Sequence, residues 1–180
     1  MFALVFTDIV DSTALANQLG DESWIELLLK HFAQARRLMA QYDHHEIKII
    51  GDSFMVVFRT AVDALDFVLA FHSETGDERI KIRAGIHVGP ARVIDDDIYG
   101  TMVNYTKRVE SATPSNWVTL SNEAKSHVDY EKAARHSLLK IRPRRAVFKG
   151  FSQPQTVWTV LPSSARREFQ VPPVPTFYGS

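Results

Sequence analysis

Apolar residues near the start of the chain change from a continuous run to helical spacing. Residues 2–10 form a β-branched and aromatic run that a single acid, Asp8, interrupts, and this pattern predicts a buried strand. Apolar residues then recur at helical intervals, first over 12–20 and next from Asp21, a residue type that caps helices, to about Tyr42. The long helix has one apolar side, so we expect it to lie on a sheet.

Two short strand-like segments follow the long helix. They span 46–50 and 53–58 and flank Gly51-Asp52. This pair of residues tolerates the backbone geometry of a tight turn and therefore indicates a hairpin. The aspartate is expected at the hairpin tip.

The rest of the chain alternates strands with helices. The expected elements are a helix over 60–72 capped by Thr60, two strands within 80–94 that meet in a second hairpin at 87–90, a helix over 100–111, a strand over 117–120, a short helix capped by Ser121, and strands over 136–141 and 156–161. This order favours an α+β fold, a ferredoxin-like α/β sandwich with helices packed on an antiparallel-rich sheet. A doubly wound parallel sheet would need longer crossovers and fewer hairpins.

Length and composition fit one domain followed by a tail. The chain has 180 residues, of which 45% are apolar, which is enough for one well-buried domain and too few for two. We assign residues 1–161 to this domain. Residues 162–180 contain four prolines and little apolar periodicity, so we expect a flexible tail or linker there.

Several classes of protein are excluded by the composition. The chain has no Cys, which excludes disulfide scaffolds, thiol catalysis and Cys-ligated metal centres and fits a cytoplasmic location. No apolar run reaches the length of about 18 residues that a membrane span needs. The 21 basic and 21 acidic residues cancel, so charge gives no argument for a nucleic acid or an anionic membrane as a partner.

The charge is balanced over the chain but not along it. Residues 1–131 carry 20 acids against 12 Lys and Arg, whereas residues 132–180 carry one acid against nine, so the two parts have net charges of −8 and +8. Two interpretations stay open: the parts neutralise each other in the fold, or an acidic centre holds metal and a basic segment faces phosphate.

Asp8 and Asp52 are the first candidates for chemistry. A carboxylate inside an apolar strand is costly to bury unless a positive charge compensates it, and a bound cation is the simplest compensation for Asp8. Asp52 supplies a second carboxylate, and two such groups suit Mg²⁺ or Mn²⁺ held mainly by substrate phosphates. Each residue taken alone is equally consistent with a strand end or a turn.

The helix expected over 100–111 carries a third group. Its apolar stripe consists of Met102, Tyr105, Val109 and Ala112, and its opposite side carries Asn104, Arg108 and Ser111. This polar side is either solvated or meets a ligand or a second chain. Arg and Asn side chains that point away from their own core can act only across an interface.

Together these residues resemble a known series of motifs. The chain carries Phe6-Thr-Asp8-Ile-Val-Asp-Ser-Thr13, Lys48-Ile-Ile-Gly-Asp52-Ser-Phe, Gly85-Ile-His-Val-Gly89, Asp97-Ile-Tyr-Gly, Val103-Asn104 with Arg108, and Lys149-Gly150. In type, order and spacing they resemble the motifs of class III nucleotidyl cyclases, most closely adenylate cyclases, over about residues 2–161.

The resemblance implies a role for each matching position. The implied metal ligands, for two divalent ions, are Asp8, Asp52 and the backbone carbonyl of Ile9. The implied catalytic residues are Asn104, which holds the ribose, and Arg108, which stabilises the α-phosphate in the transition state. The implied substrate-binding residues are Lys48 and Asp97 for the purine, Ile98 and Val103 for apolar contact with the base, and Ser12 and Thr13 among the backbone N–H groups of 10–13 for the terminal phosphates.

The implied reaction is attack of a ribose 3′-hydroxyl on the α-phosphorus, with pyrophosphate leaving. ATP is favoured because adenine offers an acceptor at N1 and a donor at N6, which match a Lys donor and an Asp acceptor, whereas guanine presents the reverse. We therefore expect an adenylate cyclase that makes 3′,5′-cyclic AMP in signal transduction. A guanylate or pyrimidine nucleotide cyclase and a catalytically silent cyclase-like module stay open as alternatives.

The resemblance also implies partners. We expect a head-to-tail homodimer in which the metal carboxylates of one chain face the base, ribose and phosphate residues of the other, and a regulatory domain outside this sequence. A haloacid-dehalogenase-type phosphatase is excluded because Val10 and Val56 stand where that family needs acids.

Three positions depart from the pattern of the cyclase family. Asp11 stands where Gly is common, and Thr106-Lys107 stand where small residues are common, which bears on the rate more than on the identity. Lys149 either approaches the phosphates or is a solvated turn residue. We assign no role to the histidines.

Overall fold

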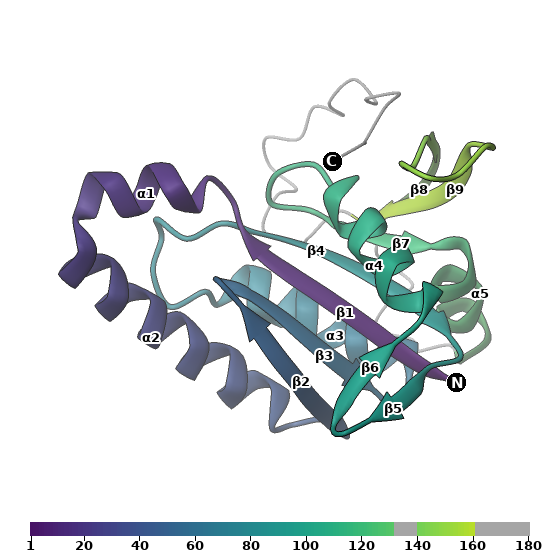
Figure 1. The fold of residues 1–180 in the computed structure, drawn as a ribbon, viewed down its shortest axis with the longest axis horizontal. Helices are drawn as coiled ribbons and strands as arrows, with labels where there is room; N and C mark the ends of the chain where they lie inside the picture. Colours follow the sequence, from purple (N-terminus) through teal and green to yellow (C-terminus); the bar gives the residue numbers. More distant parts are fainter. Residues whose placement is uncertain (132–139, 161–180) are drawn as a thin grey trace.

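The computed structural model describes residues 1–131 and 140–160, and Figure 1 shows a sheet with helices packed on it. The strands are β1 (Phe2–Ile9), β2 (His44–Ile50), β3 (Ser53–Phe58), β4 (Ile82–Gly89), β5 (Arg92–Ile94), β6 (Asp97–Tyr99), β7 (Val118–Ser121), β8 (Ile141–Ala146) and β9 (Gln155–Val160). The helices are α1 (Ser12–Leu19), α2 (Asp21–Met39), α3 (Ala61–Ser73), α4 (Thr101–Ser111) and α5 (Asn122–Glu131). None of these described helices is long and apolar enough to cross a membrane. The tail expected over 162–180 lies outside the described residues.

The main sheet has seven strands in the order β2-β3-β1-β4-β7-β9-β8. Its pairings are antiparallel except that of β4 with β7. The chain runs β1-α1-α2-β2-β3-α3-β4, and β1 lies between β3 and β4, which is the split βαβ arrangement of a ferredoxin-like fold. The expected α+β fold with an antiparallel-rich sheet is therefore confirmed.

Alternation along β1 separates two apolar clusters. Val5 and Ile9 point to one face and join the larger core with residues of α2 and α3. Leu4 and Phe6 point to the other face and pack with residues of β3, β6 and α4. Figure 1 shows α4 in front of the sheet and α3 behind it. Because Asp8 follows the same alternation, its side chain lies on the α4 face.

Strand β2 changes face in its middle. Glu46 points to α2, where Arg36 forms an ion pair with it at 2.9 Å. The register then shifts, so that Lys48 pairs with Met55 and lies on the α4 face. Without this β-bulge Glu46 and Lys48, two positions apart, would point to the same face. The bulge therefore turns Lys48 toward the face that carries Asp8.

The second hairpin is not where the sequence pattern placed it. β4 continues through Gly89 along β1, whereas β5 pairs with β6 across Asp95 and Asp96. These two residues have φ of 50° and 62°, the left-handed values that a two-residue hairpin turn requires and that Asp tolerates. The hairpin expected at 87–90 is therefore wrong, and β6, only three residues long, had no periodic signal.

Most of the strand expected over 136–141 lies outside the described residues. The described strand β8 spans Ile141–Ala146, so it includes the Arg142 to Arg145 segment that was expected to follow the strand. The strand accommodates a charge because the Arg144 guanidinium donates to Thr159 Oγ1 at 2.7 Å and to the carbonyl of Ala112 after α4. Pro143 fits because β8 ends the strand order and is an edge strand.

The helix caps expected from the sequence are partly confirmed. The hydroxyls of Thr60 and Ser121 each accept a backbone N–H bond at 3.1 Å, as expected for N-caps. Asp21 is not the cap of α2, because Gly20 occupies that position with a φ of 80°. The helix ends at Met39, earlier than expected.

His31 of α2 is buried in an aromatic part of the larger core. Its ring stacks on Phe71 with centroids 4.8 Å apart and lies 6.2 Å from the ring of Phe54. Neither ring nitrogen has a hydrogen-bond partner within residues 1–131 and 140–160. Burial lowers the pKa of His31 to about 4, because the charged imidazolium loses its hydration there.

Acidification is expected to destabilise the wild-type chain more than the His31→Phe variant. The folded-state pKa lies below the unfolded value, so the neutral imidazole contributes its full stability above about pH 6.5 and loses it as the pH falls toward 4. The difference amounts to about 3 kcal/mol. Urea unfolding between about pH 7 and about pH 4 measures it. The same pH dependence in both proteins would contradict a neutral buried His31.

Candidate active site

Asp8 and Asp52 lie beside each other at one end of the sheet. Asp8 is half-buried near the end of β1, and Asp52 lies in the turn between β2 and β3 after Gly51, whose φ is 63°. Ser53 donates a hydrogen bond from Oγ to Asp8 Oδ1 at 3.4 Å. Burial raises the pKa of Asp52, and the negative charge of Asp8 raises it further. The structure thus brings together the two carboxylates that the sequence singled out.

This carboxylate pair fits hard divalent cations. Asp52 Oδ2 is buried and has no hydrogen-bond partner in the described part of the chain, and two like charges side by side destabilise each other until a cation compensates them. Within that same part, no group of three or more His, Cys, Asp or Glu side chains could hold a metal ion. A cation here would therefore need further oxygens, which phosphates supply. Ile9 buries its side chain in the core and has only its backbone carbonyl to offer.

The N-terminus of α1 follows directly after β1. Its N-cap, Asp11, has a left-handed backbone (φ 52°, ψ 39°) and forms no side-chain cap, so the first turn offers N–H groups to an anion. Val10 does not share this role, because its N–H donates to the carbonyl of Lys81 at 2.8 Å. The Ser12 hydroxyl hydrogen-bonds to Asp52 and favours its ionised form, whereas Thr13 is exposed.

Lys48 and Asp97 form an ion pair although 49 residues separate them. The ammonium of Lys48 lies 2.6 Å from Asp97 Oδ2, and the backbone N–H of Ile98 donates to Asp97 Oδ1 at 2.8 Å. The hydrogen bond from Lys48 lowers the pKa of Asp97. The side chains are 42% and 24% exposed, so the pair presents a donor and an acceptor side by side at the surface.

The two residues expected to contact a base differ in exposure. Ile98 is buried in the apolar cluster that contains Phe6, and Val103 is half-buried against it. The contact of Ile98 with a base stays a prediction and would have to use its backbone.

Helix α4 presents Asn104 and Arg108 away from its own core. Its residues Met102, Val109 and Ala112 are buried, as the apolar stripe predicted. Asn104 is exposed and Arg108 is half-buried, and among the described residues neither side chain forms a hydrogen bond or an ion pair. The structure therefore forms two separate pairs, Asp8 with Asp52 and Lys48 with Asp97, and leaves these two α4 residues apart from both.

Three charged residues near Asp8 were not among the expected site residues. Arg83 lies opposite Asp8 in the backbone register of β4 and β1. Glu110 of α4 is 1% exposed, and Lys107 forms an ion pair with it at 2.9 Å. Burial raises the pKa of Glu110, and Asp8 is among the charges that raise it further. A signal for Glu110 does exist in the sequence, because its helical position falls next to the apolar stripe.

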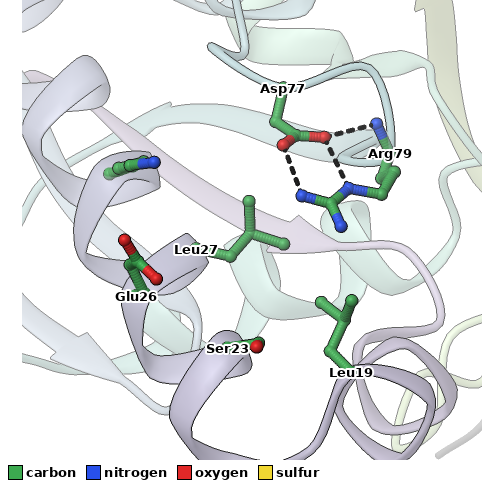
Figure 2. A pocket seen from close by; sticks show the side chains of 7 residues that line it. Leu19, Ser23, Glu26, Leu27, Asp77 and Arg79 are labelled. Atoms are coloured by element: carbon green, nitrogen blue, oxygen red, sulfur yellow. Dashed lines mark hydrogen bonds and ion pairs between the residues drawn. The ribbon is translucent and has the colours of Figure 1, made fainter.

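A small pocket lies elsewhere on the molecule, between the α1–α2 corner and the segment before β4. Its volume is about 180 Å³, and it is lined by Leu19, Ser23, Glu26, Leu27, Lys30, Asp77 and Arg79. Figure 2 shows the Asp77 carboxylate facing the Arg79 guanidinium, with the closest ion-pair atoms 2.7 Å apart. None of the expected site residues lines this pocket, so it is not the candidate active site.

Comparison with known proteins finds adenylate and guanylate cyclases among the similar proteins. A receptor-type adenylate cyclase of Trypanosoma congolense is 25% identical over an alignment 212 positions long. The alignment covers 91% of this chain and 28% of the relative. An adenylate cyclase structure from Trypanosoma brucei in its monomeric state has a TM-score of 0.81 at 20% identity and covers 94% of this chain and 91% of its own. The catalytic core of a rhodopsin-guanylyl cyclase with converted specificity, in complex with ATPαS, has a TM-score of 0.77 at 18% identity. The match covers 89% of this chain and 94% of that structure's chain.

These two structures show the same fold at low identity, and the curated relative is much longer than this chain. The family model for the adenylate and guanylate cyclase catalytic domain matches residues 1–158. This match spans all of the residues described above, from Asp8 to Arg108, and covers most of the 180 residues. The chain therefore belongs to the adenylate and guanylate cyclase catalytic domain family.

Proposed function

We propose that this domain is an adenylate cyclase that converts ATP to 3′,5′-cyclic AMP and pyrophosphate with two Mg²⁺ or Mn²⁺ ions. Its family includes both adenylate and guanylate cyclases, so the choice of base needs its own argument. The observation that carries the choice is the Lys48–Asp97 ion pair. Its ammonium donor and carboxylate acceptor match the acceptor N1 and the donor N6 of adenine, and guanine reverses that order.

The cyclisation needs positioning and charge stabilisation rather than a protein nucleophile. The ribose 3′-oxygen bonds to the α-phosphorus and releases its proton to solvent, while the bond to the bridging oxygen breaks and pyrophosphate leaves with the electron pair. Asp8 and Asp52 would hold the divalent ions, which would neutralise phosphate charge and acidify the 3′-hydroxyl. Asn104 holds the ribose, and Arg108 stabilises the charge that develops on the α-phosphate. The first turn of α1 binds the terminal phosphates through its N–H groups.

We place these residues in a head-to-tail homodimer. Asn104 and Arg108 point away from their own core, and the β5–β6 hairpin that precedes α4 exposes Val93, Ile94 and Tyr99 by 59%, 52% and 54%. Large apolar side chains exposed together on a short hairpin support an interface. In a twofold dimer the carboxylate pair of one chain meets the Lys48–Asp97 pair and α4 of the other, and this arrangement occurs twice. A regulatory domain outside this sequence would fit the greater length of the curated relative.

Incubation with ATP, GTP, CTP or UTP and Mn²⁺ tests the proposed reaction. We expect cyclic AMP and pyrophosphate in equal amounts from ATP and at least about tenfold less product from the other three, because a mismatched polar contact costs about 1–3 kcal/mol. The isosteric variant Asp52→Asn should be inactive with all four. Cyclic GMP as the main product would identify a guanylate cyclase, and no product at all would identify a silent module.

Base choice is expected to depend on Lys48 and Asp97. The double variant Lys48→Glu with Asp97→Ser removes the donor and the acceptor for adenine, so kcat/KM for ATP should fall by about tenfold or more relative to that for GTP. The matched control is Arg36→Gln with Glu46→Gln, which removes an ion pair from the opposite face of β2. The control should keep the wild-type ratio. An unchanged ATP to GTP ratio in the first variant would place base recognition elsewhere.

Mixing two inactive variants tests the composite site. Asp52→Ala and Arg108→Ala should each be nearly inactive alone. Arg108→Ala should lower the activity by about 10³-fold if Arg108 acts like other transition-state arginines. If chains exchange freely, about half of the dimers are mixed and each has one intact site, so activity should return to about a quarter of wild type. Subunit exchange is verified independently with differently tagged chains. Exchange without rescue would show that the site lies within one chain.

A further inference from the structure

The ammonium of Lys107 lies over the end of the sheet that carries the carboxylate pair. It is 2.9 Å from Glu110 Oε2 and 5.7 Å from the centre of the Phe6 ring. Phe6 and Asp8 are two positions apart on β1 and share a face, so the ammonium lies on the Asp8 side of the sheet. The Lys107 side chain is 46% exposed and therefore open to a ligand from solvent.

The partner of Lys107 is fixed in place. The Glu110 side chain is 2% exposed, and α4 approaches β4 so closely at Gly85 that a Cβ there would lie 2.4 Å from the backbone nitrogen of Glu110. In the described residues Lys107 makes one hydrogen bond, which leaves two of the three donors of its ammonium. A lysine already held in this way loses little rotamer freedom when it binds an anion, so its position favours binding.

We propose that Lys107 is a further phosphate-binding residue, which contacts the pyrophosphate leaving group at the carboxylate pair of its own chain. This inference rests on the proposed cyclase function and deepens it. Helix α4 then serves both sites of the dimer, one through Asn104 and Arg108 across the interface and the other through Lys107.

A purely structural role for Lys107 makes a different prediction. If Lys107 only neutralises the buried Glu110, removal of either partner should disturb the site in the same way. If Lys107 binds pyrophosphate, removal of its charge should weaken binding, whereas Glu110→Gln should leave the ammonium free to bind. The two variants therefore separate the two roles.

The affinity of the full chain for inorganic pyrophosphate with Mg²⁺ is the direct measurement, by calorimetry and as product inhibition. Lys107→Met, which keeps a long unbranched side chain but removes the charge, should weaken pyrophosphate binding by about tenfold to a hundredfold, as expected for a charge-assisted hydrogen bond. Lys107→Arg should keep most of the affinity, and Glu110→Gln should bind at least as tightly as wild type. Lys107→Gln replaces the Met variant if thermal unfolding shows that the latter is not folded.

Mixing then tests which chain Lys107 serves. Tight pyrophosphate binding is the readout, since Lys107→Met lowers that affinity. Lys107→Met mixed with Arg108→Ala leaves one half of the mixed dimer with Asp8, Asp52 and Lys107 intact and with Arg108 from the other chain, so sites with wild-type affinity should appear. Lys107→Met mixed with Asp52→Ala leaves neither half intact, so none should appear. Wild-type affinity in the second mixture would show that Lys107 acts on the partner chain and would overturn the inference.

The proposed function and this inference fail in different ways. Wild-type affinity for pyrophosphate in Lys107→Met, or an equal loss in Lys107→Met and Glu110→Gln, would overturn the phosphate role while cyclic AMP formation by the wild type stands. Absence of cyclic nucleotide from the wild type, together with no rescue between Asp52→Ala and Arg108→Ala, would instead remove the proposed function.

Discussion

Strand β1 is paired along both edges and covered on both faces, so its register cannot slip by one residue without exchanging its two sets of side chains. Such a slip would turn Asp8 into the larger core together with Leu4 and Phe6, and it would move Val5 and Ile9 to the α4 face. The burial that forms the two apolar clusters therefore also fixes the carboxylate of Asp8 on the α4 face. Two local features bring other charged residues to that region: the turn after β2 for Asp52 and the bulge in β2 for Lys48.

Helix α4 extends this arrangement because each of its sides has a different neighbour. Its apolar stripe fixes it to the sheet, and the absence of a side chain at Gly85 allows a close approach that buries Glu110. Arg144 of β8 donates a hydrogen bond to the backbone carbonyl of Ala112, directly after the last turn of α4. Its positive charge stabilises the negative end of the α4 dipole. These contacts hold the helix without the side chains of Asn104 and Arg108, which the proposed dimer uses across its interface.

The sequence predicted the parts of the fold that have strong local signals. The apolar run of β1, the Gly51-Asp52 turn and the stripe on α4 were sufficient to single out Asp8, Asp52 and Arg108. The hairpin of β5 and β6 was misplaced because its strands are three residues long and its turn depends on left-handed backbones at Asp95 and Asp96.

Other features depend on contacts distant in sequence. The Lys48–Asp97 ion pair joins residues 49 positions apart, and the bulge that turns Lys48 to the α4 face arises from pairing with β3. Glu110 and Lys107 become neighbours of Asp8 only when α4 packs on β1 and β4. The assignment of Glu110 and Lys107 to the site therefore required the three-dimensional structure.

The central claim is that nucleotide and metal bind between the carboxylate pair of one chain and the base-reading pair of another. A crystal structure with Mn²⁺ and 3′-deoxy-ATP, which lacks the attacking hydroxyl, tests it most directly, since anomalous scattering locates the manganese. We predict manganese on Asp8 and Asp52 of one chain and adenine on Lys48 and Asp97 of its partner. Manganese away from the two carboxylates, or adenine held by the same chain as the metal, would contradict it.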